Sequence, residues 1–128
     1  MIYALALVAS LIAGFDQPTV KVQDIVVGKG ISLSKGDVAT VLYRGTFLNG
    51  DVFDDNSQRA PFAFQVGLGQ VIKGWDQSIL GMKVGGKRSM EIPPELAYGD
   101  KDNGPIPANS TLKFEVELLR IDREKDIP

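Results

Sequence analysis

Hydrophobic and polar positions alternate most regularly near the end of the 128-residue chain. Between positions 111 and 118, the apolar residues Leu112, Phe114, Val116 and Leu118 occupy every second place, and charged or hydroxyl side chains lie between them. Successive side chains of a β-strand point to opposite faces. This period of two therefore predicts a strand with one face in a core and the other in water.

A second apolar segment, at 38–43, reads Val-Ala-Thr-Val-Leu-Tyr. Such a composition predicts a central strand that is buried on both faces. The Asn-Gly pair at 49–50 is typical of tight hairpin turns, and it predicts that the chain returns antiparallel through 52–54. This pairing brings Tyr43 and Asp54 into the same region.

Three more segments are predicted to be strands, namely 20–27, 62–66 and 87–92. In the second of them Phe62, Phe64 and Val66 share one face, and in the third Met90 and Ile92 point inward. A long segment rich in proline and glycine separates this third strand from the last strand of the chain. It is predicted to be a loop.

One helix is predicted, and it carries the only tryptophan of the chain. Ile72, Trp75, Ile79 and Met82 stand at i, i+3, i+7 and i+10, which is one face of a helix with 3.6 residues per turn. Gly74 lies inside this segment and weakens a helix by about 1 kcal/mol relative to alanine. We therefore expect a packing reason for the glycine, such as close approach of another backbone or of a ligand.

Together these elements predict one α+β domain over residues 17–128. Five or six antiparallel strands form the sheet, and the short helix lies across it, because only there can both apolar faces be buried. A length of about 110 residues is sufficient for a single compact core.

Residues 1–16 form an apolar N-terminal segment that is predicted to lie outside this domain. The first fifteen carry no charge. These fifteen residues are fewer than the ~20 that a helix needs to span a bilayer. Their length and composition match the apolar region of a signal peptide, except that no Lys or Arg precedes them. A signal peptide or anchor predicts an extracytoplasmic or membrane-associated protein. The alternative is a segment packed on the domain, which leaves a cytoplasmic location open.

The composition excludes several classes of function. The chain has 14 Lys and Arg against 16 Asp and Glu and no long run of like charge, so we expect no nucleic-acid partner. It has no cysteine and no histidine, which excludes thiol nucleophiles, disulfides, Cys/His zinc sites and imidazole bases. The Asp residues of the predicted turns match no EF-hand spacing. We expect no metal, no cofactor and a monomer.

Aromatic residues are the best candidates for a binding site. They are Tyr43, Phe53, Phe62, Phe64, Trp75, Tyr98 and Phe114. Core packing explains any one of them, because a large aromatic side chain buries about 150–250 Å². As a set they predict a partly open apolar pocket with a few hydrogen-bonding groups. Asp54 follows Phe53 on a half-buried strand and needs partners, for which Tyr43 and Arg59 are the candidates.

Six ordered segments are similar to one known family. They read Leu-Tyr-Arg-Gly at 42–45, Gly-Asp-Val-Phe-Asp at 50–54, Pro-Phe-Ala-Phe at 61–64, Gly-Gln-Val-Ile-Lys-Gly-Trp-Asp at 69–76, Ile-Pro-Pro-Glu-Leu-Ala-Tyr-Gly at 92–99, and Ile-Pro at 106–107 continuing into 112–119. From about Lys35 to Asp122 the chain resembles the FKBP-type peptidyl-prolyl cis-trans isomerases. The resemblance implies a strongly twisted antiparallel half-barrel wrapped around the helix.

The same resemblance implies an activity and a site. The activity is acceleration of rotation about Xaa-Pro bonds in proline-containing peptides and unfolded proteins, with macrolides expected to bind as inhibitors. The resemblance implies that Asp54, Tyr98, Trp75 and Phe53 are catalytic, with Trp75 as the pocket floor. The substrate-binding residues that it implies are Tyr43, Phe62, Val71, Ile72, Ile106 and Phe114. Phe64 is expected to pack behind the site.

The resemblance also implies how the polar groups act. The backbone N–H of Ile72 and the hydroxyl of Tyr98 are expected to hold carbonyl groups of the ligand, and Asp54 is expected to organise Tyr43 and Arg59. The alternative function is a proline-binding or chaperone-like module with little turnover. Retention of the four catalytic positions together favours an enzyme.

Two segments at the rim depart from the family pattern. The segments 54–61 and 99–107 are each one residue shorter than in the small cytosolic members, and the second is more acidic. Because both lie at the rim, we expect them to change substrate preference and macrolide affinity before they change activity.

Overall fold

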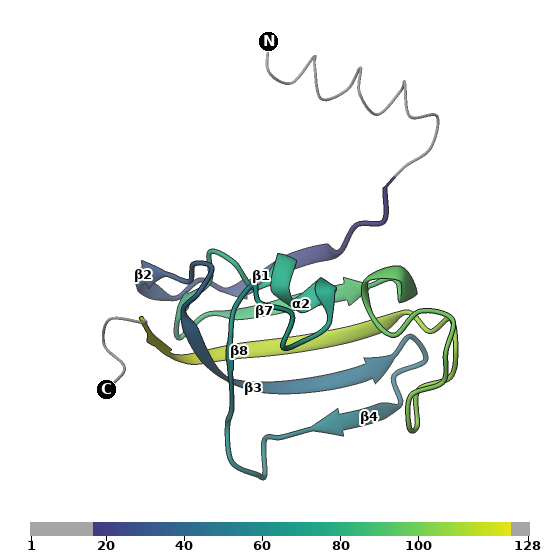
Figure 1. Cartoon of the computed structure of the whole chain (residues 1–128). Coiled ribbons are helices and arrows are strands. Elements are labelled where there is room, and N and C mark those ends of the chain that lie inside the picture. Colours follow the sequence, from purple (N-terminus) through teal and green to yellow (C-terminus); the bar gives the residue numbers. More distant parts are fainter. Residues whose placement is uncertain (1–16, 124–128) are drawn as a thin grey trace.

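The computed structural model describes residues 17–123, which form an α+β fold (Figure 1). Its elements in chain order are β1 (Lys21–Val26), β2 (Lys29–Ser32), β3 (Val38–Phe47), β4 (Val52–Asp55), β5 (Phe62–Gln65), α2 (Lys73–Ser78), β6 (Lys83–Val84), β7 (Lys87–Ile92), the 3-10 helix η1 (Pro94–Leu96) and β8 (Leu112–Asp122). The predicted fold class, a twisted antiparallel sheet of five or six strands with one short α-helix, is confirmed: over residues 17–123 the main sheet has six strands and α2 is the α-helix.

The predicted N-terminal segment, residues 1–16, lies outside the described residues. Among the residues that are described, no helix is both long enough and apolar enough to cross a membrane.

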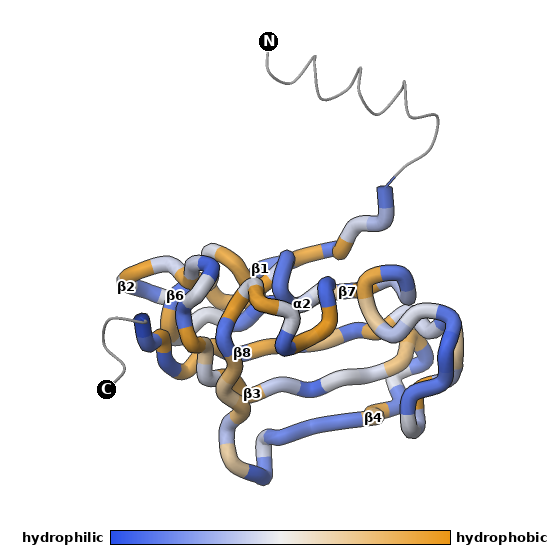
Figure 2. Tube along the Cα trace, in the orientation of Figure 1, coloured by the Kyte–Doolittle hydropathy of each residue, from blue (hydrophilic) through white to orange (hydrophobic). Residues whose placement is uncertain are grey.

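The main sheet has the order β1-β7-β8-β3-β4, with β5 also paired to β3, and each of these pairings is antiparallel. The long strand β8 lies between β7 and β3 and pairs with both. Its four alternating apolar side chains are at most 5 % exposed, so the predicted inward face is confirmed. Figure 2 shows hydrophobic positions interspersed with hydrophilic ones along β3 and β8, as expected for a sheet with one covered face.

The core lies between the sheet and α2 (Figure 1). Trp75 and Ile79 bury the helix face that the periodicity predicted, and Ile72 is the N-cap residue. The helix is shorter than the predicted apolar face, because Ile79 is already its C-cap residue. Met82 reaches the core from the following turn, where its N–H donates to the carbonyl of Ile79.

The packing reason for Gly74 is a side chain of the sheet. A Cβ atom at this position would lie 2.5 Å from Cγ2 of Ile92 on β7. That distance is far inside van der Waals contact, so glycine lets α2 lie directly on the sheet. The expected close approach is present, but it is made by a side chain and not by another backbone or a ligand.

The prediction that 38–43 is buried on both faces is wrong. The segment is central in the sheet, and Ala39 and Val41 are fully buried. Val38 and Thr40, on the other face, are only partly buried. The helix covers one face of the sheet, and in the described part of the chain no second layer covers the other (Figure 1).

Three elements, β2, β6 and η1, were not predicted from the sequence. β2 and β6 pair in a separate two-stranded sheet, and β2 begins directly after Gly28. A Cβ at Gly28 would lie 2.3 Å from the carbonyl oxygen of Val84, so this glycine permits a close backbone approach. The 3-10 helix η1 begins at Pro94, at the start of the predicted loop.

Candidate active site

A cavity of about 200 Å³ opens over the start of α2. Its lining is mostly aromatic and consists of Tyr43, Phe53, Asp54, Phe62, Gln70, Val71, Ile72, Trp75, Tyr98 and Phe114. β3, β4, β5, α2 and β8 all contribute to it, so segments far apart in the sequence meet there. The structure brings together nine of the ten site residues that the family resemblance implied.

Trp75 forms the base of this aromatic cluster. Its ring is 4 % exposed and makes edge-to-face contacts with Tyr43 and Phe114, with centroids 5.3 and 5.2 Å away. The indole Nε1–H is buried and has no hydrogen-bond acceptor within the described residues. A buried donor without a partner is energetically costly.

Gly45 permits the aromatic wall to close, and sequence reasoning missed this role. It lies on β3 opposite Asp54 of β4. A Cβ at Gly45 would lie 2.6 Å from Cζ of Phe53 and 2.8 Å from Cε1 of Phe114. The two rings themselves meet edge to face with centroids 5.6 Å apart. Any larger side chain at Gly45 would displace both of them.

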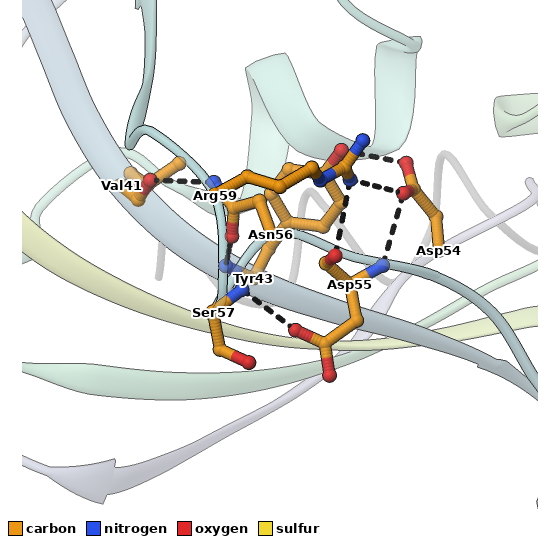
Figure 3. Close-up of polar contacts among 7 residues, drawn as sticks. All are labelled: Val41, Tyr43, Asp54, Asp55, Asn56, Ser57 and Arg59. Atoms are coloured by element: carbon orange, nitrogen blue, oxygen red, sulfur yellow. Dashed lines mark hydrogen bonds and ion pairs between the residues drawn. The ribbon is translucent and has the colours of Figure 1, made fainter.

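Asp54 joins two polar side chains at the rim of the cavity (Figure 3). The hydroxyl of Tyr43 donates to Asp54 Oδ2 at 2.6 Å, and the Arg59 guanidinium Nη2 donates to Oδ1 at 2.7 Å. The same Arg59 nitrogen also donates to the carbonyl of Asp55 at 3.0 Å. The predicted partners of Asp54 are therefore confirmed, and the shorter 54–61 segment still reaches it.

These contacts determine the protonation states at the rim. Burial opposes the charged carboxylate of Asp54, but the hydrogen bonds from Tyr43 and Arg59 outweigh burial and hold its pKa below the ordinary value. Burial, followed by the hydrogen bond to Asp54, raises the pKa of Tyr43 to about 12. Burial and the charge of Asp54 also raise the pKa of Tyr98. At neutral pH both tyrosines are hydrogen-bond donors and Asp54 is an acceptor.

The entrance loop before α2 is held by the helix itself. The carboxylate of Asp76, in the first turn of α2, accepts the N–H groups of Gly67 at 2.8 Å and Gly69 at 3.0 Å. This loop leads to Val71 and Ile72 at the cavity. Sequence reasoning missed this role of Asp76.

Ile72 occupies the N-cap position of α2 with extended backbone angles. Its carbonyl accepts the N–H groups of Trp75 and Asp76, as expected for the start of a helix. No backbone carbonyl within the described residues accepts its own N–H. Gln70 also lines the cavity, although it was not predicted there, and its side-chain Oε1 accepts the N–H of Gln65.

Ile106 is the one predicted wall residue that does not line the cavity. It is 5 % exposed and belongs to the core cluster. A β-bridge to Asn103, with N–H···O distances of 2.8 and 2.9 Å in the two directions, folds this part of the loop on itself. Phe64 packs behind the site as expected: it is 4 % exposed and stacks on Phe62 with centroids 5.5 Å apart.

A second hollow of about 230 Å³ lies on the other face of the sheet. It is lined mainly by charged side chains, among them Arg44, Lys87, Glu115 and Glu117. Glu115 and Glu117 alternate with the buried residues of β8, so they face away from the core. An open hollow with charges of both signs offers no dry floor, and Tyr43 is the one aromatic residue in its lining. The aromatic cavity is therefore the better candidate site.

The comparisons with known proteins agree with this geometry. The family model for FKBP-type peptidyl-prolyl cis-trans isomerase matches residues 29–119. FK506-binding protein 2 of Dictyostelium discoideum is 53 % identical over 93 residues, which are 71 % of this chain and 70 % of that protein. The crystal structure of AtFKBP13 is similar with a TM-score of 0.75 and 42 % identity, covering 79 % of this chain and 91 % of that one.

Longer fungal proteins match as well. FK506-binding protein 4 of Chaetomium thermophilum is 48 % identical over 102 residues, which are 80 % of this chain and 21 % of that protein. The chain thus spans about a fifth of the length of such relatives. The matched region holds every strand from β2 to β7, α2 and most of β8, and so the whole aromatic cavity. The chain belongs to the FKBP-type peptidyl-prolyl cis-trans isomerase family.

Proposed function

We propose that this protein accelerates cis–trans rotation about Xaa-Pro bonds in peptides and unfolded proteins. The observation that carries the proposal is the aromatic cavity, which has an apolar floor and a small number of polar groups at its rim. Such a cavity has the shape and chemistry to receive a proline ring. Family membership supports the same activity.

The chemistry needs no nucleophile and no acid–base pair. Rotation about the amide faces a barrier of about 18–20 kcal/mol, because resonance holds the peptide bond planar. The uncatalysed step takes tens to hundreds of seconds at an Xaa-Pro bond. A twisted amide has lost much of its resonance dipole, so it is less strongly solvated by water than the planar form. A dry apolar cavity therefore favours the transition state over the ground state.

The residues of the cavity have distinct roles in this proposal. The proline ring lies over the Trp75 indole and against the aromatic wall to which Phe53 and Phe114 belong. The N–H of Ile72 and the hydroxyl of Tyr98 hold the carbonyl groups that flank the proline. These donors orient the peptide while the amide rotates, and they bind best when the carbonyl has turned toward them.

Asp54 keeps the rim of the cavity in place. Its carboxylate accepts hydrogen bonds from Tyr43 and Arg59, which belong to two different segments. These bonds fix the ring of Tyr43 against Trp75. Tyr43, Phe62 and Val71 complete the contact with the residues on either side of the proline. Ile106 supports this wall from the core.

We further propose that macrolides of the FK506 type occupy the same cavity. Several similar proteins bear the name FK506-binding protein. The aromatic lining and the polar groups at the rim suit a ligand with apolar rings and carbonyl acceptors. The protein is proposed to act as a monomer, without a cofactor and without a nucleic-acid partner, on proline-containing segments.

A protease-coupled assay tests the activity. Leu-Pro and Phe-Pro peptides that are cleaved only in the trans form should isomerise faster with the protein, and FK506 should suppress the acceleration. Tyr98→Phe removes one donor from a side chain that is 39 % exposed, so kcat/KM should fall about three- to tenfold without a loss of stability. Trp75→Ala should remove most of the activity, and Trp75→Phe should retain part of it.

Gln77→Ala, an exposed substitution on the same helix, is the control and should match the parent protein. A rate equal to the uncatalysed one would rule out the enzyme. FK506 binding without acceleration would instead favour the proline-binding module.

For localisation, we propose that residues 1–16 act as a secretory signal or anchor, which places the domain outside the cytoplasm or at a membrane. The support is their composition alone. N-terminal sequencing of the protein from fractionated cells tests this. An N-terminus at Met1 in a soluble cytosolic fraction would contradict the proposal.

A further inference from the structure

One edge of β3 has a gap between its two partner strands. β5 pairs with β3 from Val38 to Val41, and β4 pairs with it from Arg44 onward. Opposite the gap, the backbone groups of β3 have no strand to bond with on this side, although β8 pairs with the other side throughout. Backbone N–H and C=O groups inside a sheet need partners, so something must replace the missing strand.

Asn56 fills this gap, and its contacts are drawn in Figure 3. Its side-chain Oδ1 accepts the N–H of Tyr43 at 2.6 Å, and its Nδ2 donates to the carbonyl of Val41 at 3.2 Å. Its backbone N–H also donates to the carbonyl of Tyr43 at 3.2 Å. The residue is 3 % exposed, and it satisfies three backbone groups of β3 from one position.

The chemistry of the amide suits this position. A primary amide has both an acceptor and a donor on one short side chain, so it can bond to an N–H and a C=O of the same strand. A carboxylate has acceptors only, and an alkyl side chain has neither. Asn56 therefore acts as a one-residue substitute for the strand that is missing between β4 and β5.

Asn56 is also linked to both side chains that converge on Asp54. It holds the backbone of Tyr43, whose hydroxyl donates to Asp54. Its own carbonyl accepts the N–H of Arg59 at 3.0 Å, and the guanidinium of Arg59 donates to the other oxygen of Asp54. The backbones of the two partners are thus fixed by one residue, which itself does not line the cavity.

We propose that Asn56 is a positioning residue of the active site, which sets Tyr43 and Arg59 at the distance and angle that Asp54 needs. The inference rests on the proposed function, since it deepens the account of the same cavity. Asn56 acts through Tyr43, whose ring is part of the wall and contacts Trp75. When the amide is lost, Tyr43 should loosen from Asp54 and the wall should move.

Two substitutions test the proposal in the full chain. Asn56→Ala removes both hydrogen bonds of the side chain. Asn56→Asp keeps the shape and the acceptor for Tyr43, but it replaces the donor to Val41 with a carboxylate oxygen. The matched control is Asp37→Ala. Asp37 is 5 % exposed and also accepts a backbone N–H, from Ser34, in the turn before β3 and away from the cavity.

Two readouts are used. The first is kcat/KM on a Leu-Pro peptide. The second is the Cζ resonance of Tyr43 in protein with ¹³C-labelled tyrosine, assigned with Tyr43→Phe and followed up to pH 10.5. In the parent protein, with a Tyr43 pKa of about 12, this resonance should hardly move. A tyrosine at its ordinary pKa of about 10 would be roughly three-quarters ionised there.

Both Asn56 variants should lower kcat/KM about tenfold. Asn56→Ala should also bring the titration of Tyr43 down by about one pH unit or more, whereas in Asn56→Asp the added carboxylate itself opposes ionisation of Tyr43, so only kcat/KM is compared for that variant. Asp37→Ala should lower the melting temperature to a similar degree and change neither readout. Asn56 variants that lose stability but keep the parent kcat/KM and the parent Tyr43 resonance would overturn the proposal.

The failure of the proposed function can be told apart from the failure of this inference. If the parent protein has no activity, the proposed isomerase function is wrong. The Tyr43 resonance, however, does not depend on turnover. It would still decide whether Asn56 positions Tyr43. If Asn56→Ala does not fold, Asn56→Asp, which keeps the volume of the side chain, provides the kcat/KM readout.

Discussion

Tyr43 shows at the scale of one residue how the site and the stability of the protein are coupled. Its ring contacts Trp75 and its hydroxyl donates to Asp54, so burial and hydrogen bonding both favour the protonated form. The folded protein should hold this proton to about pH 12, whereas the unfolded chain releases it near the ordinary pKa of about 10.

The stability of the protein should therefore depend on alkaline pH. The contribution of Tyr43 is fully present below pH 10 and is lost as the pH rises toward 12, because the unfolded state then binds fewer protons than the folded state. Tyr98 contributes in the same direction. The urea midpoint, followed by Trp75 fluorescence, should fall between pH 10 and pH 12. The fall should be shallower in Tyr43→Phe, and an equal fall in both proteins would contradict this assignment.

Gly74 also affects the stability of the protein, through helix propensity and through its packing against the sheet. Alanine is the better helix former by about 1 kcal/mol, so helix propensity alone predicts that Gly74→Ala stabilises α2. The added Cβ would however lie 2.5 Å from Cγ2 of Ile92. Overpacking of this kind costs about 1–3 kcal/mol, and we expect the clash to win.

A double-mutant cycle separates these two effects. Gly74→Ala should lower the free energy of unfolding in the parent protein but should be neutral or stabilising on an Ile92→Ala background, where the contact atoms are absent. Denaturant unfolding of all four proteins measures this. A Gly74→Ala protein that is more stable than the parent would show that the helix moves away from the sheet at little cost.

At the scale of elements, α2 and the loop before it form one unit. The carboxylate of Asp76 uses one oxygen for Gly67 and the other for Gly69, so the helix holds the loop that leads to the cavity entrance. This carboxylate in the first turn of α2 also has the charge that the N-terminal end of a helix dipole favours.

Asp76→Asn should release this loop while the helix remains. The amide has one acceptor oxygen where the carboxylate has two, so at least one of the two glycine N–H groups loses its partner. We expect a loss of stability of about 1–2 kcal/mol, faster hydrogen exchange at Gly67 and Gly69, and a severalfold lower kcat/KM. Gln77→Ala on the same helix is the control. Unchanged exchange at both glycines would show that the loop is held by other contacts.

At the scale of the whole molecule, residues of the hydrophobic core also form the wall of the site. Trp75 and Phe114 belong to the core cluster and line the cavity at the same time. A ligand that fills this cavity adds contacts to the core without any change of fold. Binding and global stability should therefore be linked.

FK506 should raise the melting temperature of the protein. A ligand that binds only the folded state stabilises it by about 2.7 kcal/mol at a hundredfold excess over Kd. Thermal scans with increasing FK506 measure the shift. Phe62→Ala, at a rim side chain that is 38 % exposed, should fold normally and show a smaller shift at equal ligand concentration. No shift in the parent protein would contradict the proposed macrolide site.

Local patterns allowed much of the fold to be predicted. The alternation along β8 and the apolar periodicity around Trp75 depend on neighbours in sequence, because side-chain direction repeats every two residues in a strand and every 3.6 in a helix. The Asn-Gly turn likewise predicted the hairpin of β3 and β4, and with it the contact of Tyr43 and Asp54. For the cavity residues, resemblance to a family supplied what periodicity could not.

The sequence by itself determined the α+β class, the inward faces of the strands and the excess of aromatic side chains. Only the tertiary structure decided that Gly74 makes room for Ile92, that Gly45 makes room for two rings, and that Asn56 replaces a strand. It also decided that Ile106 lies outside the cavity lining. Each of these depends on contacts between residues distant in sequence, and no local pattern encodes the distance between two packed elements.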